Sequence, residues 1–170
     1  MIQLIADIHN QEDVKKLLAT SERLNIGWIV LEGDVEKEDI ETIERHCRDK
    51  GIILTVKDNV ELLRERRLHG IQLTKNFDSI SVLRDELGGH PIVGLQVALD
   101  FPVTSVLHHD IDYISVEIGE DLKQGIEFAE KWSGVINIPI VASIKKLTKD
   151  TSDRLLEAGF KGFAIKGSTL

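Results

Sequence analysis

The chain alternates short apolar runs with segments in which apolar residues recur every three or four positions. The short runs are rich in β-branched residues and predict eight strands, at residues 2–6, 28–31, 52–56, 70–73, 91–97, 113–118, 138–144 and 162–165. Between them, apolar stripes at helical spacing predict seven helices, marked by Val14 and Leu17, Ile40 and Ile43, Val60 and Leu63, Ile80 and Leu83, Val103 and Val106, Leu122 and Ile126, and Leu155 and Ala158. The fifth of these helices is the weakest in the pattern.

Most of the predicted strands are apolar on both faces, which is typical of parallel strands covered on both sides. Eight strand–helix repeats predict an α/β protein that forms a (β/α)₈ TIM barrel, as a single domain over residues 1–170. An open doubly wound sheet is the alternative, because barrels usually have roughly 200 residues or more. No glycine-rich dinucleotide fingerprint follows a predicted strand, which favours the barrel and indicates no organic cofactor.

The last predicted strand is followed by only five residues, so the predicted barrel lacks its last helix. We expect a sector of the sheet, between the first and seventh helices, to be left uncovered. Contiguous apolar surface of more than a few hundred Å² is unusual on a soluble monomer. We therefore expect a second copy of the chain to cover it in a two-fold homodimer. Alternatively, Leu170 and the first helix fold over the gap.

Composition narrows the partners and the compartment. A net charge of −8 argues against nucleic acid or an anionic membrane surface as the main partner, but it allows a small phosphorylated ligand. Cys47 is the single cysteine, so the chain forms no internal disulfide and suits a reducing compartment. No apolar run has the length of a membrane span, and no basic head precedes the N-terminal apolar run. We expect a cytoplasmic protein.

Polar residues follow the predicted strands at the edge where parallel-sheet enzymes hold their chemistry. Four lysines come just after strands: Lys57, Lys75, Lys145 and Lys166. Their ammonium groups could converge on an anion, and separate solvated lysines are the alternative. The tail residues Gly167 and Ser168 could add backbone and hydroxyl donors to a phosphate site. His46 and His69 are expected on helices, as surface residues.

Several short segments, in order along the chain, carry a further signal: 4–7 (LIAD), 28–31 (WIVL), 51–62, 70–73 (GIQL), 92–94, 112–114, 138–142 (IPIVA) and 158–162 (AGFKG). Together they resemble the successive strand signatures of the thiamin phosphate synthase and TenI (thiazole tautomerase) family. The resemblance implies a TIM barrel and a site at the carboxyl rim of the strands for phosphorylated pyrimidine and thiazole precursors with Mg²⁺.

The family's metal-binding motif after strand three is Asn-Asp-Arg, and here it is Lys57-Asp58-Asn59. The resemblance implies that Asp58 helps to hold Mg²⁺, although an Asp before a helix is also an ordinary N-cap. Glu32 and Asp34 stand where the family has cations that grip the pyrimidine diphosphate. These two carboxylates either bind the metal directly or compensate the rim lysines.

Other positions also depart from the family pattern. Gln72-Leu73-Thr74-Lys75 replaces His-Leu-Gly-Gln after strand four, and Gln96 stands near the place of the TenI histidine. The predicted ligand-binding set is Lys57, Asn59, Gln72, Lys75, Gln96, Ser143, Lys145, Gly167 and Ser168. No catalytic residue is predicted.

Three hypotheses follow from these departures. The first is a barrel of this family that has diverged and binds or acts on another small phosphorylated molecule. The second is an active thiamin phosphate synthase or thiazole tautomerase in thiamin biosynthesis. The third is a non-catalytic, partner-binding barrel. Glu32 and Asp34, in place of cations, predict weak binding of a diphosphate and little formation of thiamin phosphate.

Overall fold

The strands of this protein close into a barrel. The computed structural model describes residues 1–88 and 90–167. Eight parallel strands pair in chain order, and β8 pairs with β1. They are β1 (Ile2–Asp7), β2 (Trp28–Glu32), β3 (Ile53–Lys57), β4 (Gly70–Leu73), β5 (Ile92–Ala98), β6 (Tyr113–Gly119), β7 (Ile140–Ile144) and β8 (Gly162–Lys166). The predicted barrel is confirmed, and the open sheet is excluded.

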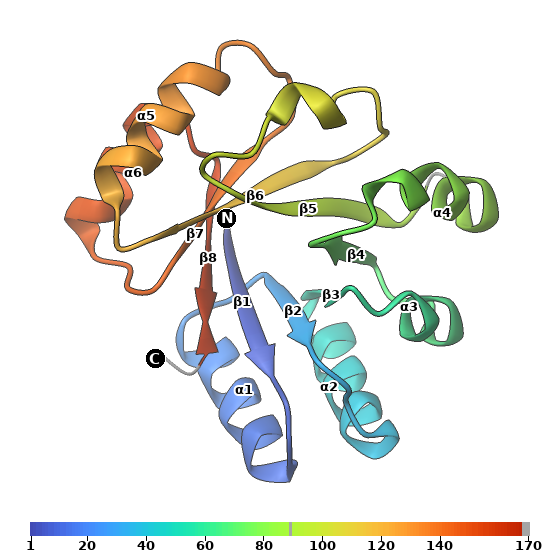
Figure 1. The fold of residues 1–170 in the computed structure, drawn as a ribbon. Coiled ribbons are helices and arrows are strands. Elements are labelled where there is room, and N and C mark those ends of the chain that lie inside the picture. The colour runs from blue at the N-terminus through green and yellow to red at the C-terminus, as the bar shows by residue number, and fades with distance from the viewer. Residues whose placement is uncertain (89, 168–170) are drawn as a thin grey trace.

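Helices surround the strands (Figure 1). They are α1 (Gln11–Arg23), α2 (Lys37–Lys50), α3 (Val60–Arg66), α4 (Ile80–Leu87), α5 (Leu122–Trp132) and α6 (Lys149–Ala158), with the 3₁₀ helices η1 (Phe77–Ser79) and η2 (Val103–Val106). Local signals set their ends. The Asn10 side chain accepts hydrogen bonds from the backbone N–H groups of Glu12 and Asp13 and so caps α1, and α2 ends at Gly51 in the left-handed conformation.

The predicted fifth helix is wrong in kind, because η2 is a short 3₁₀ helix. Its single turn already buries both Val103 and Val106, so the apolar stripe requires no longer helix. Figure 1 shows η2 in the sector between α4 and α5, where the other units place a full helix.

Alternate residues of each strand face the helices or the barrel interior. The interior holds a small apolar cluster of Ile5, Trp28, Val30, Tyr113, Val141 and Ala164. The rings of Trp28 and Tyr113 meet edge to face, with centroids 5.2 Å apart. A Cβ atom on Gly94 would lie 2.0 Å from Cζ of Tyr113, so only glycine leaves room for this ring.

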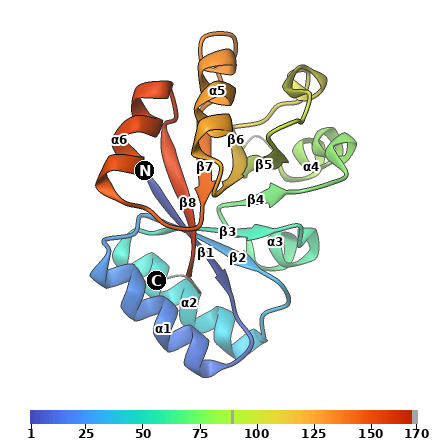
Figure 2. The same ribbon diagram turned by 60° about the vertical axis from the view of Figure 1, so that its left-hand side comes forward.

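The outer face of β8 is not open in this structure. Phe163 and Ile165 point away from the barrel interior, and they are 5% and 3% exposed. In Figures 1 and 2, α6 and α1 lie on the two sides of β8. The expected open apolar strip is therefore absent at these two residues, and the homodimer stays a prediction without that support.

Within residues 1–88 and 90–167, no helix is both long enough and apolar enough to cross a membrane.

Candidate functional site

The carboxyl end of the barrel gathers most of the inward-facing polar side chains. Because strand residues alternate between two faces, residues two positions beyond the inward apolar cluster also face inward. The register places Asp7 beside Glu32, Lys57 beside Gln72, and Glu117 beside Ser143. The strand order thus brings carboxylates, ammonium groups and amides from different units to one rim.

Three charged side chains at this rim contact one another and form an ion triad: Glu32 of β2, Lys57 of β3 and Lys166 of β8. Lys57 Nζ lies 2.5 Å from Glu32 Oε1, and Lys166 Nζ lies 3.6 Å from Glu32 Oε2. The side chain of Lys57 is 11% exposed, that of Glu32 27% and that of Lys166 54%. One carboxylate therefore bridges two ammonium groups at the mouth of the barrel.

The environment of Glu32 combines opposing effects on its pKa. Partial burial alone would raise the pKa of this carboxyl, but the hydrogen bond and charge of Lys57, with a contribution from Lys166, outweigh it. The pKa of Glu32 is held below its ordinary value. The carboxylate is therefore ionised at neutral pH, and the triad carries one net positive charge.

Asp58 is hydrogen-bonded to Thr74, the residue that follows β4. Its Oδ1 accepts the backbone N–H of Thr74 at 2.8 Å, and its Oδ2 accepts the Thr74 hydroxyl at 2.5 Å. Asp58 has a positive φ of 54° and does not cap α3, since the Asn59 side chain accepts the Leu62 N–H instead. Asp58 thus ties the end of β3 to the end of β4.

Two hollows meet beside the ion triad. One, of about 570 Å³, is lined by residues of the β2 and β3 ends, namely Glu32, Gly33, Asp34, Lys57, Asp58, Asn59, Val60 and Glu61. The other, of about 480 Å³, includes Asp7, His9, Glu32, Lys166 and Gly167 in its lining. Glu32 belongs to both. The structure therefore brings together Glu32, Asp34, Lys57, Asp58 and Asn59, and places Gly167 on the other side of Glu32.

A hydrogen-bonded ladder leads from the barrel interior to the same rim. The Tyr113 hydroxyl donates to Gln72 Oε1 at 2.9 Å, and Gln72 Nε2 donates to Gln96 Oε1 at 2.8 Å. Gln96 Nε2 then points to Glu117 Oε2 at 3.5 Å. Burial raises the pKa of Tyr113, so its hydroxyl stays a donor and fixes the direction of the ladder. The Gln96 amide therefore presents its donor side to the rim.

Other predicted residues lie apart from the triad. Lys145 is exposed and pairs with Glu120 at 3.0 Å. Lys75 is exposed, and no ion pair of it occurs within the described ranges. Ser143 is half-buried at the end of β7. Ser168 lies outside the described residues.

Two of the three carboxylates predicted to hold Mg²⁺ are engaged by other groups of the chain. Both oxygens of Asp58 accept hydrogen bonds from Thr74, and both oxygens of Glu32 face lysines. In residues 1–88 and 90–167, no cluster of three His, Cys, Asp or Glu side chains could hold a metal ion. That Asp58, Glu32 and Asp34 hold Mg²⁺ stays a prediction.

Sequence reasoning missed three contributors to this rim, namely Thr74, Tyr113 and Glu117. Tyr113 and Glu117 lie four residues apart on β6 and therefore face the same way. Counting every second residue along β6 from Tyr113 would have placed Glu117 on the inward face. Nothing in the sequence pattern pairs Thr74 with Asp58.

The fold and the rim define a (β/α)₈ barrel whose open end carries an anion-bridged pair of lysines. Comparison with known sequences adds the family. The sequence model of the family described as thiamine monophosphate synthase matches residues 31–168, so the chain belongs to this family.

Curated relatives agree with this assignment at low identity. The thiamine-phosphate synthase of Lactococcus lactis is 25% identical over 149 residues, covering 82% of this chain and 68% of the relative. That of Erythrobacter litoralis is 23% identical over 141 residues, covering 75% of this chain and 64% of the relative. The chain thus spans about two thirds of the length of these relatives.

Solved structures share the fold. A thiamine phosphate pyrophosphorylase from Pyrococcus furiosus superposes with a TM-score of 0.73 at 21% identity, covering 97% of this chain and 84% of that chain. A mutant tryptophan synthase alpha-subunit from the same organism has a TM-score of 0.75 at 8% identity, covering 98% and 87%. At these identities the likeness concerns the fold alone.

Proposed function

We propose that this chain binds a small phosphorylated molecule at the carboxyl rim, with Lys57 and Lys166 as the partners of the phosphate. The observation that carries the proposal is the bridging of both ammonium groups by Glu32. A carboxylate held by two cations occupies the kind of place that an anionic ligand group prefers. The phosphate would displace Glu32 from one or both lysines.

The burial of Lys57 supports this role. Its side chain is only 11% exposed, and burial of a charged side chain favours an anion close by. Glu32 is more exposed and stands at the junction of the two hollows, so its side chain has solvent-filled space into which it can turn. An exchange of one anion for another keeps Lys57 paired in both states.

The hydrogen-bonded ladder offers a second contact for the rest of the ligand. Gln96 presents a donor and Glu117 an exposed acceptor, on β5 and β6 across the barrel mouth from the triad. A ligand with a phosphate at one end and a polar ring or amide at the other would use both sides of the rim. No step of this proposal involves a metal.

Synthesis of thiamin phosphate, or thiazole tautomerisation, is the second candidate function. Family membership favours it, as do the relatives described as thiamine-phosphate synthases. Glu32 and Asp34 argue against it, because they put negative charge at the end of β2 and in the following loop, where both residues line the 570 Å³ hollow. A partner-binding barrel without a ligand is the third candidate and is an outcome of the test below.

Calorimetric titration with inorganic phosphate and pyrophosphate tests the proposal. Lys57→Ala should weaken phosphate binding by about tenfold to a hundredfold, the range for losing one charge-assisted contact. Lys75→Ala is the matched control, since it removes a rim lysine outside the triad, and it should bind as the wild type does. Equal loss in both variants, or no phosphate binding at all, would reject the site. An assay for thiamin phosphate formed from the pyrimidine diphosphate and the thiazole phosphate with added Mg²⁺ separates the two functions, since turnover would support the second candidate.

A further inference from the structure

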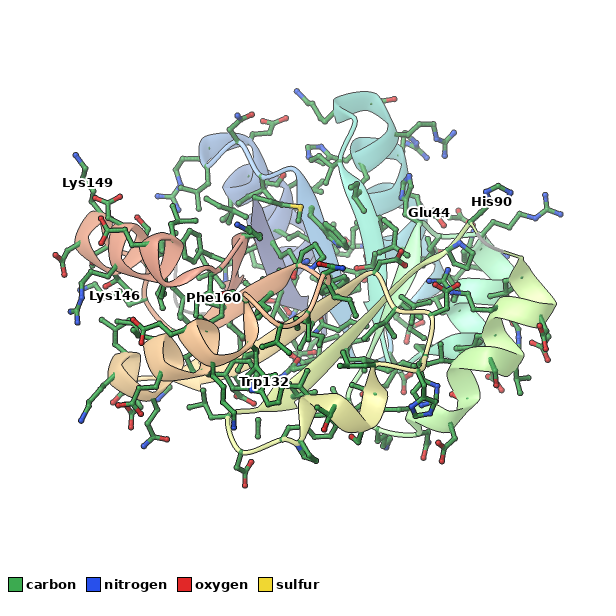
Figure 3. The ribbon with its side chains drawn as sticks, turned by 90° about the horizontal axis from the view of Figure 1, so that it is seen from above. Glu44, His90, Trp132, Lys146, Lys149 and Phe160 are labelled. Atoms are coloured by element: carbon green, nitrogen blue, oxygen red, sulfur yellow. The ribbon has the colours of Figure 1, made fainter. Side chains whose placement is uncertain are left out.

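A pocket with a basic rim lies at the opposite, amino-terminal face of the barrel. It has a volume of about 430 Å³ and is lined by Glu44, Cys47, Arg48, Gly51, Ile52, Ile53, Leu54, Arg66, Arg67, Leu68 and His69. We call it the basal pocket. A neighbouring hollow shares Arg67, Leu68 and His69 with it and extends to His90. Figure 3 shows Glu44 and His90, one from each hollow, on the same edge of the molecule.

The charges around the basal pocket run against the charge of the whole chain. Three arginines and one glutamate are among the residues that line it, whereas the chain has a net charge of −8. Arg66 pairs with Glu41 at 3.2 Å and with Glu44 at 3.7 Å. Arg48 and Arg67 form no ion pair within the described ranges, so two guanidinium groups remain available to an anion.

His69 adds a donor of fixed orientation. It was predicted on a helix and instead lies in the connection between α3 and β4. Its Nδ1 accepts the backbone N–H of Leu54 at 3.0 Å, so in the neutral ring the proton sits on Nε2. The ring is exposed and therefore offers Nε2–H as a donor.

The backbone of Arg67 is unusual for its residue type. Four non-glycine residues of the described part have positive φ, and three of them are Asn or Asp, which tolerate this conformation. Arg67 is the fourth, with a φ of 51° at the end of α3. Glycine would adopt this conformation without strain, so a side chain here has a backbone cost. Arg67 lines both hollows, which gives its guanidinium a use that a glycine would lose.

Beneath these donors the wall is apolar. Cys47, Ile52, Leu54 and Leu68 are all buried and line the pocket. We infer that the basal pocket binds a second small ligand, which carries a phosphate or carboxylate group on a compact apolar body. The anionic group lies against Arg48, Arg67 and His69, and the apolar body rests on the buried wall. This site is separate from the proposed rim site and does not depend on it.

Phenyl phosphate is the probe, and site-resolved NMR is the readout, because the rim also attracts phosphate. Titration should shift the Leu54 amide and His69 ring signals of the full chain. Arg67→Gly removes the guanidinium while suiting the positive φ, and Arg48→Ala removes the other unpaired one. Each should weaken the binding followed at Leu54 by about tenfold, and the double variant should abolish it.

Two controls keep this inference apart from the proposed rim function. Arg154→Ala removes an exposed arginine on α6 that pairs with Asp150, and it should leave the Leu54 titration unchanged. Lys57→Ala should also leave it unchanged while weakening the rim. Absent shifts at Leu54 and His69, an undiminished titration in the double variant, or equal binding of phenol would each overturn the inference.

Discussion

One substitution in the ion triad should both lower the free energy of unfolding and raise the affinity for phosphate. Glu32→Gln removes the carboxylate that bridges Lys57 and Lys166 and keeps its size. At 2.5 Å the attraction between Lys57 and Glu32 is about 7 kcal/mol for an effective dielectric of 20 and about 2 kcal/mol in bulk water. Desolvation offsets much of this, so we expect a loss of about 1 to 3 kcal/mol in the free energy of unfolding.

The same carboxylate repels an incoming phosphate. A phosphate charge roughly 5 Å from Glu32 meets a repulsion of roughly 1 to 3 kcal/mol between the two dielectric limits. Its removal should tighten phosphate binding by roughly 5- to 150-fold. Glu117→Gln is the control for inorganic phosphate, which lacks the second polar end proposed to reach Glu117. It removes an exposed rim carboxylate outside the triad and should change phosphate binding by less than about threefold.

Urea unfolding and calorimetric titration with inorganic phosphate measure the two effects. The pKa of Glu32 lies below its ordinary value of 4.5, so its contribution to stability is complete above pH 4.5. That contribution is lost as the pH falls through the lowered pKa of the folded state. The stability difference between wild type and Glu32→Gln should therefore vanish in acid. A folded Glu32→Gln protein that binds phosphate no better than wild type would refute this account of the triad.

Three further predictions concern the barrel interior and the core. Tyr113 is the single tyrosine and its pKa is raised by burial, so absorbance at 295 nm should show no tyrosinate until alkali unfolds the protein; titration near pH 10 in the folded state would contradict this. Gly94→Ala should destabilise the fold by about 1 to 3 kcal/mol or more, measured by urea unfolding, because its Cβ would overlap the Tyr113 ring; a loss below about 1 kcal/mol would show that the ring can move aside. Burial, with a smaller effect of Glu44, raises the pKa of Cys47 to about 12, so a thiol reagent at pH 8 should label it only on unfolding; rapid labelling of the native chain would place the thiol at the surface.

The barrel was predictable because its signal is repeated in every unit. Most strands are apolar on both faces, and each helix carries one apolar stripe, so errors of one or two residues at the ends leave the topology unchanged. The fifth helix failed where the pattern was weakest. Val103 and Val106 have helical spacing and are both buried, but a single turn suffices to bury them.

Which lysines converge was not predictable without the strand ends. Lys57 and Lys166 are the last residues of β3 and β8, on the inward side of each strand. Lys75 and Lys145 lie beyond the ends of β4 and β7, where alternation no longer fixes direction. The predicted strands ended one residue short at both inward lysines, so all four looked equivalent.

The triad also changes the meaning of the charge at Glu32. From sequence alone, an acidic residue where the family has a cation implied simple repulsion of a phosphate. In the structure, a cation on the neighbouring strand β3 and another on β8, beyond β1, face that residue, so positive charge is present but occupied. A single phosphate carries enough charge to replace one carboxylate between two lysines. The second phosphate of a diphosphate would face Glu32 and Asp34 in the hollow at the β2 and β3 ends. We therefore predict that the rim binds a monophosphate more tightly than a diphosphate, which would set it apart from a site built to hold the pyrimidine diphosphate.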